Sequence, residues 1–354
     1  MMKSWLLGLC LLIAGLTLAP QPGGADGPSL EGRLNDAFDA GALPGLHGVL
    51  VLRDGDLFAE TYFKGQDQRW GREIGLRQHG PDTLHDLRSV TKSIVGLLYG
   101  IALEQDLVPA PDAPLLVQFP SYADLRGDPA REAITVRDAL NMTMGTEWNE
   151  DLPYTNPRNS EIAMERAPDP IRYVLEQEMV DEPGRRWVYN GGATALIGHM
   201  IARGADERLE VYAERVLFAP LGITEFEWVN GSRGTASAAS GLRMSARDLA
   251  RLGRMIEQDG QVNGRQIVPS AWLETIFTPQ ASAVSGLRYS QFWWLAPEGD
   301  PPIWVAGFGN GGQRLMINRA AGVVLVVFAG NYNHPDDWKL PVKVTTDFVI
   351  PALR

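Results

Sequence analysis

Ser89-Val90-Thr91-Lys92 places a lysine one helical turn after a serine, at the start of a long apolar segment. Residues three apart on a helix share a face, so the amine of Lys92 can reach the hydroxyl of Ser89. A neighbouring amine is one way to make a hydroxyl nucleophilic without a histidine. The alternative is an exposed lysine on an ordinary helix, and the surrounding sequence has to decide between the two interpretations.

The residues that follow Ser89 predict a buried helix. The apolar residues that form its broad surface are Ile94, Val95, Leu97, Leu98, Ile101 and Leu103. A serine at the N-terminal end of such a helix lies near the positive end of the helix dipole and beside unpaired backbone amides. That setting favours a developing oxyanion.

Composition places the chain among large globular proteins. The chain has 354 residues, a length near that of two domains. Its residues are 45% apolar, which suffices for a large core. The formal net charge is -11, and the arginines are spread evenly along the chain. Because nucleic-acid binding needs clustered cations, we expect no nucleic-acid partner.

The N-terminus predicts a secretory signal peptide over residues 1–25. Lys3 is followed by an apolar run over residues 5–19, and Gly23-Gly24-Ala25 offers small residues for cleavage after Ala25. We therefore expect a secreted, periplasmic protein with no stable membrane span in the mature chain; an uncleaved N-terminal membrane anchor is the alternative. Cys10 lies inside this segment, so the mature chain would have no cysteine for disulfides or thiol catalysis.

Strands are expected near both ends of the chain. Residues 47–53 predict a strand, Asp54-Gly55 a tight turn and residues 57–63 the antiparallel partner. Residues 64–83 have the composition of a loop. Near the C-terminus, residues 314–318 and 323–328 predict a second hairpin, and a terminal helix is expected over 337–350.

Between these strands the chain is mostly helix and loop. Helices are expected after the cap Thr135, after Asp169-Pro170, over 192–203 and over 209–218. The order predicts an α+β fold (an α/β sandwich) in which an antiparallel sheet, built from N- and C-terminal strands and flanked by helices, carries an inserted, mostly helical domain. The α/β part would comprise about residues 26–94 and 281–354, and the helical part about 95–280.

Two glycine-rich motifs follow the serine-lysine pair along the chain. Residues 183–192, Pro-Gly-Arg-Arg-Trp-Val-Tyr-Asn-Gly-Gly, place Tyr189 at a glycine-rich entry to a helix, and residues 307–313, Gly-Phe-Gly-Asn-Gly-Gly-Gln, place glycines before a strand. With the serine-lysine pair first, the chain resembles the serine β-lactamase and penicillin-binding protein superfamily, in its class C-like hydrolase branch. The likeness covers nearly all of residues 26–354 and includes the segments 86–88, 140–145, 217–223 and 241–250. It implies a β-lactamase/transpeptidase-like fold.

By this resemblance Ser89 is the nucleophile, Lys92 its activating neighbour and Tyr189 the group that exchanges protons with the serine and the leaving group. A serine hydroxyl is a poor nucleophile until a base takes its proton. Either a tyrosinate or a neutral lysine could be that base, and the sequence does not choose between them. Without the family, Tyr189 would be a half-buried aromatic at a helix start.

The resemblance also places the oxyanion hole at the backbone amides of Ser89 and Gln313. The residues before Gln313 that would let substrate approach the strand are Asn310, Gly311 and Gly312. The alternative for these three residues is a plain turn into a strand.

The chain departs from the β-lactamases of this branch at two places. Gly191 stands where they carry an asparagine two residues after the tyrosine, and asparagine occurs only at Asn190. Asn310 stands where they carry lysine or histidine, so a carboxylate on the substrate would lack its cation unless Arg314 substitutes. These departures argue against β-lactam turnover. With them, the two motifs resemble those of the esterases and 6-aminohexanoate-oligomer hydrolases of the superfamily.

Other residues are weaker candidates for substrate contact. In such relatives the segment 148–154 lines the cleft, which nominates Trp148, Glu150 and Tyr154, although surface loop residues are an equal alternative. Aromatic residues at 289 and 292–294 would form either a cleft wall or part of the core.

Competing chemistries fit less well. The five histidines, at 47, 79, 85, 199 and 334, show no paired-ligand spacing, so we expect no metal and no cofactor. No Gly-x-Ser-x-Gly elbow surrounds Ser89. The sequence therefore predicts a serine hydrolase that cleaves a small-molecule ester or amide through an acyl-enzyme. The alternatives are a DD-peptidase or weak β-lactamase acting on peptidoglycan-like substrates, and a non-catalytic sensor domain; the oligomeric state is left open.

Overall fold

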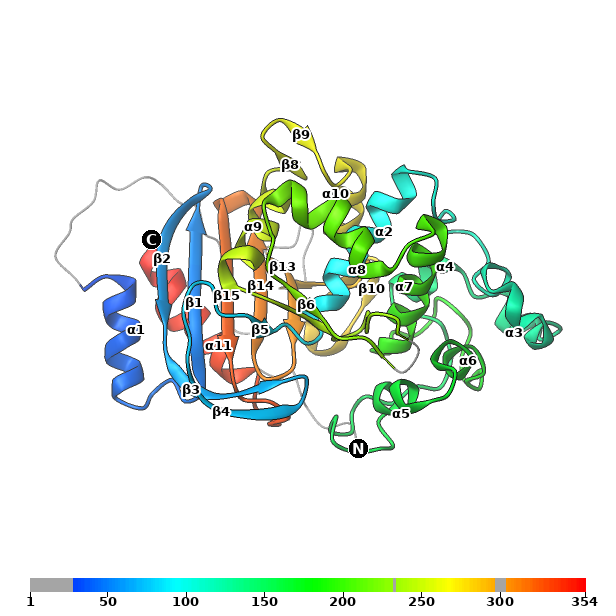
Figure 1. Cartoon of the computed structure of the whole chain (residues 1–354), viewed down its shortest axis with the longest axis horizontal. Helices are drawn as coiled ribbons and strands as arrows, with labels where there is room; N and C mark the ends of the chain where they lie inside the picture. The colour runs from blue at the N-terminus through cyan, green and yellow to red at the C-terminus, as the bar shows by residue number, and fades with distance from the viewer. Residues whose placement is uncertain (1–27, 232–233, 297–303) are drawn as a thin grey trace.

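The computed structural model describes residues 28–231, 234–296 and 304–354. At its centre is an eight-stranded antiparallel sheet with the strand order β10-β11-β12-β13-β14-β15-β1-β2 (Figure 1). Its strands are β1 (Leu46–Arg53), β2 (Asp56–Tyr62), β10 (Ala281–Ser282), β11 (Arg288–Ser290), β12 (Trp293–Ala296), β13 (Trp304–Gly309), β14 (Gln313–Asn318) and β15 (Val323–Ala329). Because β1 pairs with β15, the N-terminal hairpin extends a sheet made by the C-terminal part of the chain.

The remaining elements surround this sheet. The helices are α1 (Leu30–Asp39), α2 (Val90–Glu104), α3 (Pro129–Glu132), α4 (Val136–Leu140), α5 (Ser160–Arg166), α6 (Pro170–Leu175), α7 (Gly191–Ala205), α8 (Leu209–Ala213), α9 (Ala246–Glu257), α10 (Ser270–Phe277), α11 (Lys339–Lys343) and α12 (Ile350–Leu353). Wider π-helical turns, Glu214–Phe218 and Val344–Val349, continue α8 and α11. Short 3-10 turns occupy Leu116–Gln118, Pro120–Leu125, Ala219–Leu221, Val284–Gly286 and Arg319–Ala321. The smaller strands are β3 (Lys64–Arg69), β4 (Arg72–Gln78), β5 (His85–Asp86), β6 (Glu227–Trp228), β7 (Leu242–Met244), β8 (Gln261–Val262) and β9 (Arg265–Gln266).

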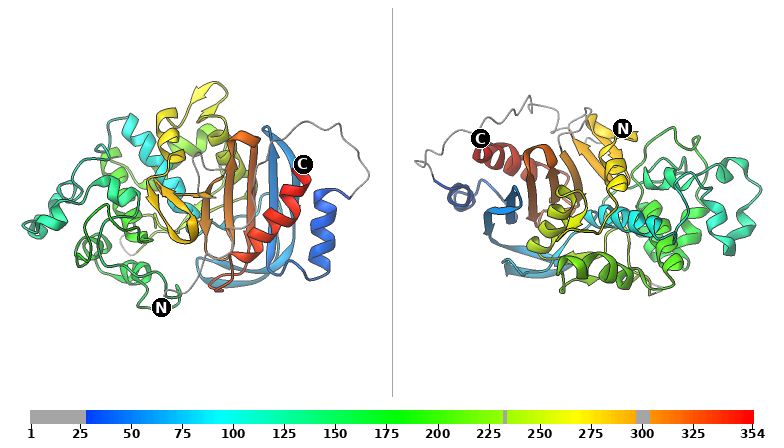
Figure 2. Two further views of the ribbon diagram at one scale, coloured as in Figure 1. Left: turned by 180° about the vertical axis from the view of Figure 1, so that it is seen from behind. Right: turned by 90° about the horizontal axis from the view of Figure 1, so that it is seen from above.

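Both faces of the central sheet are covered by helices (Figure 2). Side chains alternate along a strand, and in β1 Val49 and Val51 join one core cluster while Leu50 joins the other. The smaller cluster packs under α1 and α11, and the larger one continues into the helical part of the chain. This double cover explains why β15 is apolar and buried along its whole length.

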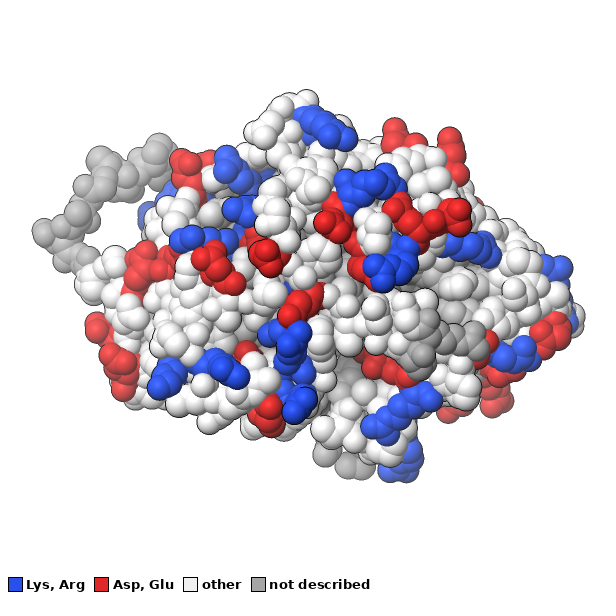
Figure 3. All heavy atoms as spheres, viewed as in Figure 1, with Lys and Arg blue, Asp and Glu red and all other residues white. Residues whose placement is uncertain are grey.

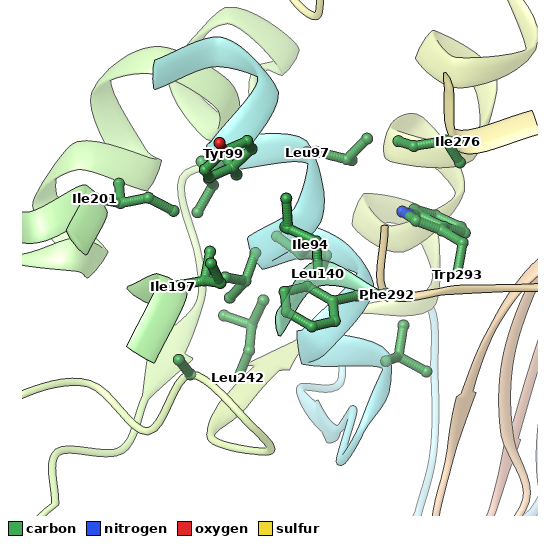
Figure 4. Packing of buried hydrophobic residues seen from close by; sticks show 14 of the residues in the cluster. Ile94, Leu97, Tyr99, Leu140, Ile197, Ile201, Leu242, Ile276, Phe292 and Trp293 are labelled. Atoms are coloured by element: carbon green, nitrogen blue, oxygen red, sulfur yellow. The ribbon is translucent and has the colours of Figure 1, made fainter. Parts of the chain in front are cut away.

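Helix α2 joins the sheet to the helical part. Its residues from Val90 to Ala102 are all buried, and Figure 4 shows Ile94 and Leu97 among side chains from several elements. Two of its glycines make the close packing possible: a Cβ on Gly96 would lie 2.4 Å from the carbonyl oxygen of Gln291, and one on Gly100 would lie 2.0 Å from the ring of Trp272. The serine-lysine pair therefore begins a rigid, central element.

The predicted fold class is confirmed, and so are its main elements. The cap at Thr135 is present as a full capping box, and α6 begins after Asp169 as expected. The loop predicted over 64–83 is wrong: β3 and β4 form a hairpin that turns at Trp70 and Gly71, with φ of 51° and 83°. The error arose because both strands are mostly polar and show little of the apolar alternation that marks a half-buried strand.

The N-terminal predictions concern a different part of the chain. The expected signal peptide, residues 1–25, lies outside the described residues. Among the helices that the structure describes, none combines the length and the apolar character needed to cross a membrane. On the face seen in Figure 3, acidic and basic side chains are intermixed.

Candidate active site

Ser89 lies at a strained turn between β5 and α2. It is the N-cap residue of α2, and the preceding Arg88 has φ of 49°, in the left-handed region that non-glycine residues avoid. Neighbouring groups hold this turn: the Arg88 guanidinium forms an ion pair with Asp86 at 3.2 Å and lies 4.8 Å from the ring centre of Tyr332. Such strain costs about 1–3 kcal/mol and persists only where the surroundings fix it.

Lys92 is fully surrounded by hydrogen-bond acceptors. Its Nζ lies 3.1 Å from Ser89 Oγ, 3.0 Å from Glu161 Oε2 and 2.9 Å from the carbonyl oxygen of Ala239. The residue is 1% exposed. An ammonium group has three protons to donate, so these three acceptors satisfy it completely.

The surroundings of Lys92 favour its charged form. Burial alone would lower the pKa of Lys92, but the negative charge of Glu161, helped by Tyr189 and Glu150, raises the pKa above its ordinary value. At neutral pH the group is therefore an ammonium that donates to Ser89 Oγ.

Glu161 is a site residue that the sequence analysis missed. It lies in the first turn of α5, where the side chain of Asn159 caps the helix by accepting from the amide of Glu161. Its carboxylate fills the space beside Gly191: a Cβ built on that glycine would lie 2.2 Å from Glu161 Oε2. The departure at Gly191 thus has a physical reason, because any side chain there would displace the carboxylate that pairs with Lys92.

Tyr189 closes the other side of Ser89. Its ring centre lies 5.0 Å from Lys92 Nζ. Burial raises the pKa of Tyr189, and the opposing effects of Lys92 and Ser89 do not reverse this, so the resting group is a phenol. The ring stacks on Trp294 at 5.7 Å.

Glu150 organises the loop before α5. It accepts hydrogen bonds from the Trp148 indole at 2.6 Å, the Tyr154 hydroxyl at 2.8 Å and the amide of Gly191 at 2.6 Å. Burial, followed by the charge of Glu161, raises the pKa of Glu150 to about 7. The predicted contacts Trp148 and Tyr154 therefore both bind this half-buried carboxyl group.

The glycine-rich motif packs directly against the Ser89 turn. A Cβ on Gly309 would lie 2.3 Å from the carbonyl oxygen of Leu87, so only glycine permits this approach. Gly311 and Gly312 have φ of 91° and 101°, and the Gly311 amide donates to Asp337 at 2.7 Å. The backbone of Gln313, which opens β14, is thereby held beside the start of α2.

The side chains around this motif serve the fold. The Gln313 amide nitrogen donates to the carbonyl oxygens of Asn310 and Ala329, at 3.2 and 2.6 Å. The Asn310 side chain accepts from the amide of Asn333 at 3.0 Å. Asn190 is the N-cap of α7, and its side chain accepts from the amide of Ala193 at 3.0 Å.

Arg314 places a positive charge against the glycine-rich motif, with Nη1 3.4 Å from the carbonyl oxygen of Gly309. It is 6% exposed, and its guanidinium lies 4.3 Å from the ring centre of Phe308. Phe308 stacks on Trp294, which in turn stacks on Tyr189. Burial lowers the pKa of Arg314 to about 10, against the raising effect of Asp337. A row of aromatic rings thus connects this cation to the tyrosine of the site.

The structure brings together Ser89, Lys92 and Tyr189, and adds Glu161 and Glu150 as carboxyl groups around them. Of the aromatic residues that were either wall or core, Tyr289, Phe292 and Trp293 are almost completely buried. Elsewhere, His47, His79 and His85 lie close enough to share a metal ion, which their spacing in the sequence did not indicate.

Comparison with known sequences identifies the family of the chain. A family model described as Beta-lactamase matches residues 32–340. The 6-aminohexanoate-dimer hydrolase of Paenarthrobacter ureafaciens is 25% identical over 318 residues, which are 84% of this chain and 74% of that protein.

Solved structures share the fold. EstCE1, described as a hydrolase with promiscuous acyltransferase activity, superimposes with a TM-score of 0.71 at 16% identity, over 89% of this chain and 96% of its own. The D-alanine carboxypeptidase AmpC of Burkholderia cenocepacia gives 0.63 at 17% identity, over 90% and 97%. The expected β-lactamase/transpeptidase-like fold is therefore confirmed.

Proposed function

Because this chain belongs to the beta-lactamase family, we propose that it is a serine hydrolase that cleaves an ester or amide bond through an acyl-enzyme on Ser89. The observation that carries the proposal is the 3.1 Å contact between Lys92 Nζ and Ser89 Oγ. A buried ammonium with three acceptors, one of them a serine hydroxyl at a helix start, is costly to build for structural reasons alone. The non-catalytic sensor, the main alternative, needs no such arrangement.

The proton of Ser89 needs an acceptor, and the resting forms of Lys92 and Tyr189 are both protonated. We assign this role to Glu161 acting through Lys92. As Ser89 Oγ bonds to the substrate carbonyl carbon, its proton moves to Lys92 Nζ while Lys92 passes a proton to Glu161 Oε2, 3.0 Å away. Lys92 therefore stays a cation throughout, and the negative charge moves from Glu161 to the carbonyl oxygen.

Tyr189 serves the leaving group. When the tetrahedral intermediate collapses, the Tyr189 hydroxyl gives its proton to the departing alcohol or amine, and the phenolate is stabilised by the Lys92 cation. The proton held on Glu161 then returns through Lys92 to Tyr189. Water attacks the acyl-enzyme in the place of the leaving group and reverses these transfers.

The oxyanion would be held by the backbone amides of Ser89 and Gln313. The tight packing of Gly309 against Leu87 supports this assignment, because it fixes the strand edge relative to the serine turn. Each well-aimed donor of this kind contributes about 3 kcal/mol to the transition state. For the substrate itself, the relative named as a 6-aminohexanoate-dimer hydrolase makes short amide oligomers the first compounds to test.

Labelling with a fluorophosphonate probe followed by peptide mapping tests the nucleophile. We expect modification at Ser89 in the wild type and none in Ser89→Ala. The matched control is Ser93→Ala, on the same helix, whose hydroxyl donates to the carbonyl oxygen of Phe292 at 2.8 Å. Labelling at another residue, or full hydrolysis by Ser89→Ala, would exclude the proposed chemistry.

A substrate panel separates the remaining possibilities. It should contain short-chain esters, 6-aminohexanoate oligomers, a D-Ala-D-Ala peptide and a chromogenic cephalosporin. Hydrolysis of esters or oligomers is expected; turnover confined to the peptide or the cephalosporin would favour the DD-peptidase or β-lactamase alternative. Export is tested separately, by N-terminal sequencing of the protein from the periplasm, where we expect the chain to begin after Ala25.

A further inference from the structure

Three histidines meet in the interior beside the β3–β4 hairpin. His47 comes from β1, His79 follows β4 and His85 lies in β5. Their exposed fractions are 0%, 5% and 1%. One ring nitrogen from each lies within 4.8 Å of the others. Asp67 of β3, 2% exposed, directs Oδ1 to within 3.7 Å of His85 Nε2.

The hydrogen bonds of His85 show how its ring is oriented. Its Nδ1 lies 3.1 Å from the carbonyl oxygen of Asp86. A carbonyl can only accept, so the proton belongs on Nδ1 and the lone pair on Nε2. That lone pair meets His47 Nδ1 at 2.9 Å and the Asp67 carboxylate at 3.7 Å. A metal-bound histidine has the same outer hydrogen bond to a carbonyl, which sets its tautomer.

The other members of the cluster have unused bonding capacity. Among the described residues, Nε2 of His47 and Nε2 of His79 have no hydrogen-bond partner although both are buried. Asp67 is held in place by the hydroxyl of Tyr332, at 3.0 Å, and by the amide of Gln68, at 2.8 Å. Buried polar atoms are nearly always paired, so these two ring nitrogens show bonding capacity that the described residues leave unused.

The backbone closes tightly over the cluster. A Cβ on Gly65 would lie 2.4 Å from the His47 ring, and one on Gly330 would lie 2.5 Å from it. Glycine at both positions lets two chain segments cover His47.

We propose that His47, His79 and His85, with Asp67 as the fourth ligand, form a structural zinc site. Three imidazoles and one carboxylate, without sulfur, are a typical zinc donor set, and four protein ligands in a closed interior indicate a structural site. Tetrahedral zinc holds its ligands roughly 3.3 Å apart. The three ring nitrogens, within 4.8 Å of one another, would have to draw together, and the Asp67 carboxylate, 3.7 Å from His85 Nε2, would have to move toward the other two rings. The ion would tie the β3–β4 hairpin to β1 and to β5, the strand that leads into the Ser89 turn.

Metal titration of the whole chain, purified without a polyhistidine tag and treated with a chelator, tests this site. We expect about one Zn²⁺ or Co²⁺ per chain, a visible Co²⁺ spectrum of the intense tetrahedral type, and a higher melting temperature with the ion bound. His79→Gln and Asp67→Asn should each weaken binding by more than about 10-fold, since even outer partners of metal ligands matter that much.

Two other histidines supply the controls. His199 packs on Phe119 and His334 is exposed, both outside the cluster, so His199→Gln and His334→Gln should bind the ion as the wild type does. The wild-type titration is decisive even if a cluster variant does not fold. Wild-type protein that takes up no ion, shows only a weak six-coordinate Co²⁺ spectrum, or binds no better than His79→Gln would overturn the zinc site. Hydrolysis is not a readout, so failure here leaves the proposed function standing.

Discussion

The Lys92 cluster and the histidine cluster are both buried, and only three residues separate His85 from Ser89 along the chain, yet they balance polar groups in opposite ways. Around Lys92 each proton of the ammonium has an acceptor, and the carboxylate of Glu161 supplies the opposing charge. Around His85 the lone pairs and a carboxylate converge, and two ring nitrogens are unpaired among the described residues. In the Lys92 cluster the protein itself supplies both the cation and the opposing carboxylate. In the histidine cluster the proposed zinc ion would supply the cation.

This difference indicates what each cluster can do. Charges that already neutralise one another can exchange protons without large rearrangement, which suits acid–base chemistry. Lone pairs that lack a cation suit ion binding. The strained turn at Arg88 lies between the two clusters, so both hold the segment that presents Ser89.

Removing the cation from the complete cluster should have the largest effect. Lys92→Met leaves the Glu161 carboxylate, whose side chain is 3% exposed, without its partner. Breaking a buried pair in this way costs about 3–5 kcal/mol of unfolding free energy, and loss of the proton relay should lower kcat/KM for ester hydrolysis by about 10²–10⁴-fold. Chemical denaturation and steady-state kinetics measure the two effects.

The control for this variant is Lys339→Met, an exposed lysine paired with Asp336 at 2.8 Å. It should change stability by less than about 1 kcal/mol and leave hydrolysis unaltered. Near wild-type rates in Lys92→Met would show that the pairing with Glu161 is structural, and the contrast between the clusters would lose its functional meaning.

The pH dependence of stability probes the second carboxyl group. The pKa of Glu150 is raised from 4.5 to about 7, so between these values the folded protein holds a proton that the unfolded chain has released. The free energy of unfolding should therefore fall as pH rises from 4.5 to about 7, by at most about 1.4 kcal/mol per pH unit. Glu150→Gln should remove this fall, as measured by denaturation at a series of pH values.

Glu147→Gln is the matched control, because Glu147 is exposed three residues earlier. It should keep the wild-type slope. A Glu150→Gln profile parallel to the wild type would mean that Glu150 is an ordinary carboxylate and that the Lys92 cluster is less closely coupled than its contacts indicate.

Gly191→Ala tests the space that Glu161 occupies. The new methyl group would meet Glu161 Oε2 at 2.2 Å and push the carboxylate away from Lys92. We expect a loss of about 1–3 kcal/mol in unfolding free energy, as for overpacked interiors, together with a fall in kcat. Gly32→Ala in α1, where the nearest atoms are 3.6 Å away, should be neutral or slightly stabilising. Equal behaviour of both variants would contradict the tight packing at Gly191.

The comparison also shows what local sequence can and cannot reveal. Ser89 and Lys92 were predictable because residues three apart on a helix must meet, and the strand pairing of β14 with β15 followed from apolar runs around a turn. Tyr189 came from the family resemblance. Glu161 had no local signal, because its partner Lys92 is 69 residues away and the two meet only through tertiary packing.

The histidine cluster was missed for a related reason. Metal-ligand spacing rules describe ligands on one helix or hairpin, whereas His47, His79 and His85 come from three separate segments. The polar β3–β4 hairpin, which contributes Asp67, was expected to be a loop. Both errors concern residues whose neighbours are set by the sheet rather than by the adjacent sequence.

The smallest expected effect separates a helix cap from a substrate contact. Asn190, predicted as a contact, accepts from the amide of Ala193 and is 3% exposed. If capping is its role, Asn190→Ala should lose about 1 kcal/mol of unfolding free energy, and Asn190→Ser should recover most of it, because serine also caps helices. KM for ester hydrolysis should stay within about twofold in both variants, since a cap acts on the helix and not on bound substrate. If KM rises in both variants while their stability is unchanged, Asn190 contacts the substrate, as the sequence predicted, and its role is not that of a helix cap.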